Sequence, residues 1–230
     1  MDIEIHSAAR QTTGPPQPFQ QHWRFGAALQ ALGQPACRAV LRDRQGPVGQ
    51  ALVLRRRIAK VLPVALISRG PIWETPDPAR RQTGLEALAA RLRHGVASGV
   101  LLTPEETPNG AGISGATKIV TPASVAEWDI CGEHAALRAG LRQTWRHSLA
   151  RAERAGLHLQ SAAPGAARLV ALLDRDVAQQ RARRYRGYPA ALTAAWAGTG
   201  KQATRAYSVH ARDGRCLAEA LFLLHAPIAT

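Results

Sequence analysis

Leu137-Arg-Ala-Gly-Leu-Arg-Gln-Thr-Trp-Arg-His-Ser-Leu-Ala-Arg-Ala-Glu-Arg-Ala-Gly156 is the stretch around which the rest of the chain can be arranged. Its apolar residues recur at spacings of three and four, which places them on one face of a helix. They are Leu137, Leu141, Trp145, Leu149 and Ala152. Gly156 stands where a C-cap glycine belongs, and the last turns are cationic, as the helix dipole favours. The pattern predicts one helix over 133–156 that packs by this stripe and offers Arg146, Arg151 and Arg154 to an anion.

The charge of the chain is the second feature. Its 230 residues carry a formal net charge of +14, which raises nucleic acid or another polyanion as a partner. Only three of the 30 basic residues are lysines, and alanine is very common, a composition that GC-rich genes also produce. A functional basic surface and a compositional bias are therefore both open.

Metal, disulfide and targeting signals are missing from the sequence. Cys37, Cys131 and Cys216 lie far apart, and no Cys/His spacing of a zinc site or disulfide framework occurs. We expect no metal and no tightly bound cofactor. The first residues lack the apolar segment of a signal peptide, and no run has the length of a membrane span. We expect a cytoplasmic protein without a membrane span.

Taken in order, the chain alternates helical and extended patterns. Residues 1–18 are polar and rich in proline, and we expect a loop or arm. Helices are expected at 19–33, 77–95, 133–156, 166–184 and 190–197, and extended segments at 37–42, 47–58, 62–68, 100–103, 118–120, 124–130, 157–160, 204–211 and 216–224. Asp213-Gly214 is the strongest hairpin turn signal. The fold class is mixed α/β (α+β), with an antiparallel-rich sheet.

Familiar catalytic motifs are absent. The Gly110–Gly115 stretch matches GxGxxG only superficially and is interpreted as a loop, because no confident helix follows it. Glu219 is the one carboxylate in an apolar strand, and strand alternation can send it either to solvent or into a cleft. The arginines of 133–156 and of Arg181–Arg186 can bind phosphates through guanidinium pairs, or they can form ordinary solvated helix faces.

Four motifs in order resemble those of the FemA/FemB/FemX-like proteins, peptidoglycan-bridge aminoacyltransferases of the GNAT acyltransferase superfamily. They are Gln21-His-Trp-Arg-Phe-Gly26, Ser68-Arg-Gly-Pro-Ile-Trp73, Glu127-Trp-Asp-Ile130 and Trp145–Gly156, the last being the most specific. The resemblance covers residues 19 to 224. It implies tandem GNAT-like folds, with an N-terminal domain over 1–130 and a second domain over 131–230 that is incomplete at its C-terminal end.

The resemblance also implies an activity, an acyl or aminoacyl transfer from aminoacyl-tRNA or acyl-CoA, as a co-substrate, to an amine. The acceptor would have phosphate or peptidoglycan-precursor character, and tRNA would be a partner. Substrate-binding residues carried over from the motifs are Trp23, Arg69, Trp73, Arg146, Arg151 and Arg154, with Arg146 at the position that contacts acceptor phosphate. Glu219 and Tyr207 are the candidates for the catalytic proton transfer.

Two departures from the family pattern matter. Members that bind a nucleotide-linked precursor carry a lysine three residues after the glycine of the first motif, where this chain has Leu29. The strands that would complete the second GNAT-like fold are expected beyond Thr230. Two alternatives therefore stay open beside the enzyme: a non-catalytic module that binds RNA or another polyanion, and an inactive, truncated GNAT pair.

Overall fold

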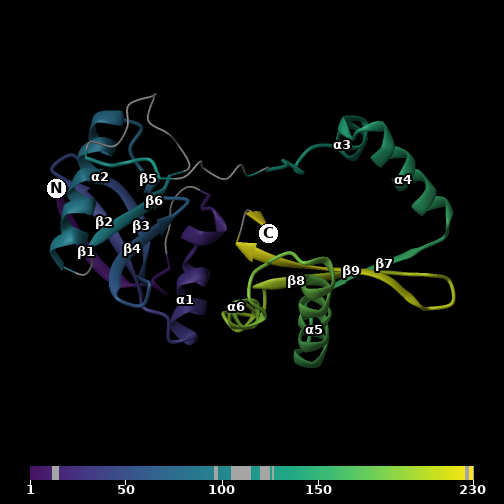
Figure 1. Cartoon of the computed structure of the whole chain (residues 1–230). Helices are drawn as coiled ribbons and strands as arrows, with labels where there is room; N and C mark the ends of the chain where they lie inside the picture. Colours follow the sequence, from purple (N-terminus) through teal and green to yellow (C-terminus); the bar gives the residue numbers. More distant parts are fainter. Residues whose placement is uncertain are drawn as a thin grey trace.

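The computed structural model of the chain shows two α/β units joined through their helices (Figure 1). It describes residues 1–11, 16–95, 98–104, 115–119, 125, 127–225 and 228–229. Residues 110–114 of the glycine-rich loop, and residues 120, 124 and 126 of the predicted extended segments at 118–120 and 124–130, lie outside the described residues. Where those two segments are described, they form no strand.

The first unit is built on one mixed sheet in the strand order β1-β2-β3-β4-β6, with β5 paired to β3. Its strands are β1 (Asp2–Ser7), β2 (Ala36–Asp43), β3 (Gly46–Ile58), β4 (Leu62–Ser68), β5 (Ile72–Trp73) and β6 (Gly99–Thr103). All pairs are antiparallel except β4 with β6. The predicted loop at 1–18 is therefore wrong over β1, because six residues pair with β2 at the sheet edge.

Helices cover both faces of this sheet. Helix α2 (Pro78–Gly95) buries Leu88 and Leu92 against residues of β2, β3 and β4 on one face. The short 3-10 helix η1 (Phe19–Gln21) and helix α1 (Trp23–Ala31) lie on the other face, where Phe25 and Leu29 join Leu52 of β3 in a second core.

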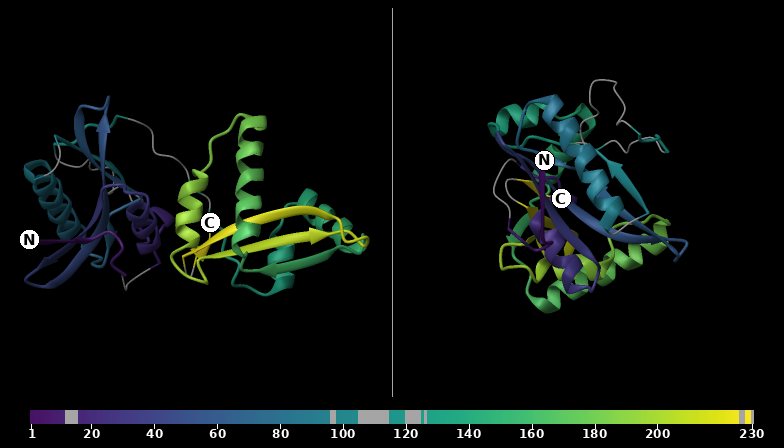
Figure 2. Two further views of the ribbon diagram at one scale, coloured as in Figure 1. Left: turned by 90° about the horizontal axis from the view of Figure 1, so that it is seen from below. Right: turned by 90° about the vertical axis from the view of Figure 1, so that its left-hand side faces the viewer.

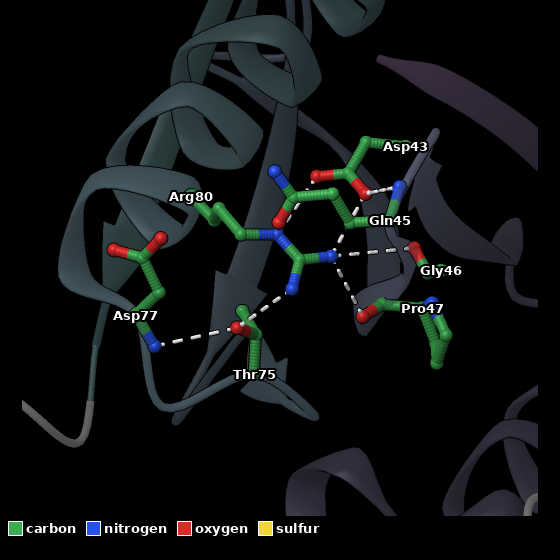
Figure 3. Close-up of polar contacts among 7 residues, drawn as sticks. All are labelled: Asp43, Gln45, Gly46, Pro47, Thr75, Asp77 and Arg80. Carbon is green, nitrogen blue, oxygen red and sulfur yellow. Dashed lines mark hydrogen bonds and ion pairs between the residues drawn. The ribbon is translucent and has the colours of Figure 1, made fainter.

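The turn between β2 and β3 is fastened to α2 by Arg80 (Figure 3). Its guanidinium donates to both carboxylate oxygens of Asp43 at 2.8 Å and to the Thr75 hydroxyl at 3.1 Å. This ion pair lowers the pKa of the Asp43 carboxyl, and Asp43 in turn accepts from the Gln45 N–H at 2.8 Å. Every partner of Arg80 is part of the turn or of the segment before α2, so the cluster supports the fold.

The second unit is a four-stranded antiparallel sheet in the order β10-β9-β8-β7. Its elements are β7 (His158–Ala162), α5 (Ala166–Arg183), α6 (Ala190–Ala197), β8 (Thr204–His210), β9 (Cys216–His225) and β10 (Ile228–Ala229). Helices α5 and α6 lie on one side of this sheet and α3 and α4 on the other (Figures 1 and 2). The predicted hairpin is confirmed, with Gly214 at a φ of 83° in its turn.

The long helix predicted over 133–156 is wrong in one respect: it is two helices, α3 (His134–Gly140) and α4 (Gln143–Arg154). Leu141 and Arg142 are extended between them. Arg146 stabilises this break by donating to the carbonyl oxygens of Ala139 and Leu141 at 2.8 and 2.6 Å, groups that a helix end leaves without partners. Arg138 also bridges the two helices through Glu153 at 2.7 and 2.8 Å.

The predicted packing of the apolar stripe is also wrong. Neither α3 nor α4 contains a buried residue, and Trp145 is 67% exposed. The facing side of the second sheet is open as well, since Leu159 of β7 is 67% exposed. The predicted helix end is confirmed, because Gly156 has a φ of 65°. Among the described helices, none is both long enough and apolar enough to cross a membrane.

Candidate functional site

Gln21 positions the first two sequence motifs relative to each other. Its side-chain oxygen accepts from the Leu52 N–H at 2.7 Å, and its amide nitrogen donates to the Ser68 carbonyl at 2.6 Å. A Cβ at Gly70 would lie 2.7 Å from the Gln21 side chain. The buried Arg38 guanidinium donates to the Gln21 carbonyl at 2.8 Å. The turn that carries Arg69 is thereby held against the start of α1.

The two units meet in a cluster of aromatic and histidine rings. Its members are Phe19 and His22 from the first unit and Tyr188, Trp196 and His225 from the second. Phe19 stacks on Trp196 with ring centroids 4.5 Å apart and contacts Tyr188 at 4.8 Å. The rings of His22 and His225 are 5.8 Å apart. Because Trp196 and Phe19 are both buried, this cluster continues the core of the first unit into the second.

Two polar contacts reinforce this junction. The Gln20 side chain donates to the Tyr188 hydroxyl at 2.9 Å, and Arg24 of α1 donates to the Thr199 hydroxyl at 2.8 Å after α6. Burial raises the pKa of Tyr188 and lowers the pKa of His225, and the positive charge of Arg69 acts to lower both. Arg69 therefore lies near the second unit.

His22 must be neutral at this junction. Its Nδ1 accepts from the Arg24 backbone N–H at 3.2 Å, which caps α1, and a protonated ring could not accept that bond. Burial lowers the pKa of His22 to about 4, with further lowering by His225, Arg24 and Arg38.

We expect this histidine to make the protein less stable in acid. The unfolded chain takes up the His22 proton near its ordinary pKa and the folded chain only near 4, so stability falls as pH drops between these values. The ring is half-buried, so solvent screening leaves a loss of about 1–2 kcal/mol. Urea unfolding at pH 7 and pH 4.5 measures it. The His22→Asn variant keeps a cap acceptor and should lose less stability; an equal loss in both proteins would contradict the assignment.

An open cavity of about 670 Å³ adjoins the junction in the second unit. It is lined by β9 from Cys216 to Leu221, by residues of α5, and by Gly187 and Tyr188 of the loop that follows α5. Tyr188 belongs both to the cavity and to the ring cluster. Apolar side chains of α5 and β9 and a few charged groups line the cavity, as is usual for small-molecule sites.

Glu219 is the central charged group of this cavity. Its carboxylate is bonded by Arg175 and lies 3.4 Å from the Arg168 guanidinium. Arg168 also donates to the Ser208 hydroxyl at 3.0 Å, and His210 lies 2.9 Å from the same hydroxyl. The Glu219 side chain is 16% exposed, so of the two orientations that the sequence leaves open, it takes the one into a cleft.

The structure does not bring the two catalytic candidates together. Glu219 pairs in register with Ser208, on the face covered by α5. Tyr207 precedes Ser208 on the same strand and therefore points to the opposite face, where its ring contacts Phe222 at 5.4 Å. Of this pair, only Glu219 lines the cavity.

The predicted substrate-binding residues fall into three places. Trp23 and Arg69 lie at the junction, where Trp23 is next to His22 and stacks with Arg24. Trp73 lies on the far side of the first sheet, within the α2 core and against Gly49 and Gly84. Arg146, Arg151 and Arg154 lie on α4, away from the junction (Figure 1). The Arg146 guanidinium is already bonded to the carbonyl oxygens of Ala139 and Leu141 at the break before α4.

Several residues of this cavity are not singled out by the sequence patterns. The sequence marks Tyr185–Pro189 as a break after a helix and Arg181–Arg186 as a candidate phosphate-binding run, but neither pattern places Gly187 and Tyr188 in the lining of a cavity. No group of three or more His, Cys, Asp or Glu side chains suited to a metal occurs among the described residues.

Comparisons with known proteins support the fold. No protein-family model matches the sequence, and no curated protein matches it. The crystal structure of FemX matches with a TM-score of 0.63 at 13% sequence identity, over 91% of this chain and 57% of the FemX chain. The chain thus spans little more than half the length of FemX, and over nine tenths of its own length it has a FemX-like fold.

Proposed function

We propose that this protein is an acyl- or aminoacyltransferase that moves an acyl group from aminoacyl-tRNA or acyl-CoA to an amine. The FemX-like fold over 91% of the chain is the observation that carries the proposal. The acceptor would be a phosphate-bearing molecule such as a peptidoglycan precursor. Because both donors are cytoplasmic molecules, the reaction would take place in the cytoplasm.

The cavity at the junction supports this proposal by its size and its charges. In the reaction, the acceptor ammonium group first loses one proton to solvent, and the free amine then attacks the ester or thioester carbonyl, so that the new N–C bond forms and the C–O or C–S bond breaks. A carboxylate can accept the second proton from the nitrogen and pass it to the leaving oxygen or sulfur, which departs as the alcohol or thiol. Among the described residues, the carboxylates that line the cavity are Glu219 and Asp176, and Asp176 is already bonded by Gln180 and Tyr185.

The ion pairs of Glu219 suggest how an amine would reach it. The side chain of Arg175 is 61% exposed, whereas that of Arg168 is 35% exposed and also bonded to Ser208. Exposed ion pairs contribute little to stability, so an incoming ammonium group can replace Arg175 while Arg168 continues to orient the carboxylate. In this proposal Glu219 first binds the amine and then takes its proton.

A transfer assay tests the proposal. Purified protein is incubated with aminoacyl-tRNA or acyl-CoA and with UDP-linked or lipid-linked muropeptide amines, and products are identified by mass spectrometry. We expect Glu219→Gln to lower kcat/KM by about 100-fold or more, the usual contribution of a general base. The control is Asp213→Asn, a charge-matched change in an exposed turn. Absence of transfer with every pair would contradict the proposal, and full activity of Glu219→Gln would remove that residue from it.

A second candidate function is binding of RNA or another polyanion without catalysis. The net charge of +14 favours it, as do the exposed arginines of α4. It requires affinity for arbitrary nucleic acid that falls steeply with salt. Weak binding that does not change with salt would exclude it.

A further inference from the structure

The loop between α5 and α6, Arg184–Pro189, is held in place by side chains from both units. The Gln180 oxygen accepts from the Gly187 N–H at 3.0 Å, and the Gln180 nitrogen donates to Asp176 at 2.7 Å. Tyr185 donates to Asp176 at 3.3 Å. Gln20 of the first unit holds Tyr188. A Cβ at Gly187 would lie 2.8 Å from the amide nitrogen of the Gln180 side chain, so a larger residue there would displace the Gln180 contacts. The loop is thus fixed before any ligand binds.

The arginines of this segment contrast with the rest of the loop. Four lie on the last turn of α5 and on the loop: Arg181, Arg183, Arg184 and Arg186. All four are exposed, and none makes a side-chain hydrogen bond or ion pair with a described residue. Some other arginines of the chain are paired, as Arg80 is with Asp43 and Arg138 with Glu153. This segment therefore presents four closely spaced guanidinium groups on a backbone that the contacts of Gln180 and Gln20 hold in place.

Arg184 itself occupies an unfavourable backbone conformation. It ends α5 with a φ of 54° and a ψ of 38°, the left-handed region. Glycine is the usual residue at this position of a helix end, because a Cβ is disfavoured there. Helix stability therefore does not explain why this residue is arginine. A binding role for the Arg184 side chain would account for a strained backbone conformation at this position.

Two tyrosines, Tyr185 and Tyr188, lie among these arginines in the sequence. Tyr185 is 42% exposed and Tyr188 is 37% exposed, and Tyr188 lines the cavity. One guanidinium group can donate two parallel hydrogen bonds to the oxygens of a phosphate. Tyrosine rings can stack on nucleotide bases. We propose that the segment Arg181–Tyr188 binds the nucleotide phosphates of a substrate whose reacting group enters the adjoining cavity. That the reacting group enters the cavity rests on the proposed function, whereas nucleotide binding by the segment does not.

Equilibrium binding without turnover tests the proposal. The probes are CoA, a short RNA ending in CCA-3′ and UDP, which distinguish a thioester donor, a tRNA donor and a nucleotide-linked acceptor. The test variant is Arg184→Gly/Arg186→Gln. Its control is Arg91→Gln/Arg93→Gln, two exposed positions of α2 whose substitution removes the same charge.

We expect at least one probe to bind the wild type and to bind the loop variant at least about tenfold more weakly, since charge-assisted contacts to phosphate are strong. The α2 variant loses the same amount of charge away from the loop, so it measures the loss of nonspecific attraction alone. We expect its affinity to stay within about twofold of wild type. For the RNA, the slope of log affinity against log salt should become shallower by about 0.7 for each phosphate that the variant no longer neutralises. Equal weakening in both variants, or no binding of any probe, would overturn the proposal.

A single substitution at Arg184 distinguishes an effect on binding from an effect on stability. Glycine at 184 relieves the left-handed arginine, so we expect the single variant Arg184→Gly to have a Tm at least equal to wild type and yet bind more weakly. Weaker binding with a lowered Tm would overturn the proposal as stated, because damage to the loop would then explain it. Transfer activity is not used in this test; loop-dependent binding without transfer would contradict the proposed function alone.

Discussion

Replacing Trp196 with alanine is expected to lower the free energy of unfolding by about 3–5 kcal/mol, the usual cost of removing a large buried aromatic side chain. Trp196 has no exposed surface, stacks on Phe19 at 4.5 Å and donates to the Ala203 carbonyl at 2.8 Å. Its neighbours in the same core include Phe25 and Leu52 of the first unit. The substitution would leave a cavity between the two units rather than within one.

The consequence is a coupled loss of stability. Because the core that contains Trp196 also contains residues of α1 and β3, both units should unfold in one transition at a lower urea concentration. Circular dichroism and tryptophan fluorescence, followed together, measure it. Trp196→Phe keeps the stack and loses the N–H, while the Ala203 carbonyl still accepts from the Leu224 N–H at 2.8 Å, so it should cost about 1–3 kcal/mol, the penalty of one lost buried hydrogen bond and a smaller ring. A wild-type-like Trp196→Ala would contradict the assigned junction.

Gly26→Ala is expected to destabilise the protein by about 3 kcal/mol or more, because the new methyl group overpacks a rigid site. Gly26 is buried on α1, and a Cβ there would overlap the carbonyl group of Ala8. That obstacle is backbone, so relief requires α1 or the chain after β1 to move. Since η1 and α1 hold the junction residues Phe19 and His22, we also expect weaker contact between the units.

Gly140→Ala is the matched control for this prediction. Gly140 is also helical, at the end of α3, but a Cβ there meets no atom within 4 Å. Alanine is the better helix former by about 1 kcal/mol in a helix interior, so this variant should be neutral or slightly more stable. Differential scanning fluorimetry of both variants would show it. Similar Tm values for the two would contradict the close approach of α1 to Ala8.

Local sequence patterns predict the helices and strands that are determined by their own residues. The strand Leu62–Ser68 and the helix Ala190–Ala197 have the bounds that their patterns predict. The β8–β9 hairpin follows from its Asp213-Gly214 turn. Strand β1 escapes prediction because it is set by pairing with β2, about 35 residues along the chain, and no local property of its six residues requires that partner.

The predicted helix over 133–156 shows the opposite limit. Its apolar period runs without interruption from Leu137 through Leu141 to Trp145, so the pattern cannot reveal that the chain is extended at Leu141 and Arg142. The break depends on Arg146 reaching back to two carbonyl groups. An amphipathic pattern also predicts which face of a helix is apolar, but it does not predict whether another element covers that face. The pattern therefore predicts a buried Trp145, whereas the residue is exposed.

The candidate site is predictable only in part for a related reason. Glu219 stands out because a carboxylate in an apolar strand is unusual. Tyr188 does not, because its significance depends on Gln20, which precedes it by 168 residues. The motif match points to the arginines of α4, whereas the described cavity lies between α5 and β9. Long-range contacts of this kind cannot be inferred from spacing alone.

Hydrogen–deuterium exchange with and without substrate would test most directly whether the cavity beside Tyr188 is the functional site. The protein is labelled alone and with CoA, with CCA-ended RNA or with UDP, and peptides from the loop between α5 and α6 are compared with those from α4. We predict slower exchange over residues 180–193 and no change over 143–154. Protection confined to α4, or absent from both segments with every probe, would contradict this assignment.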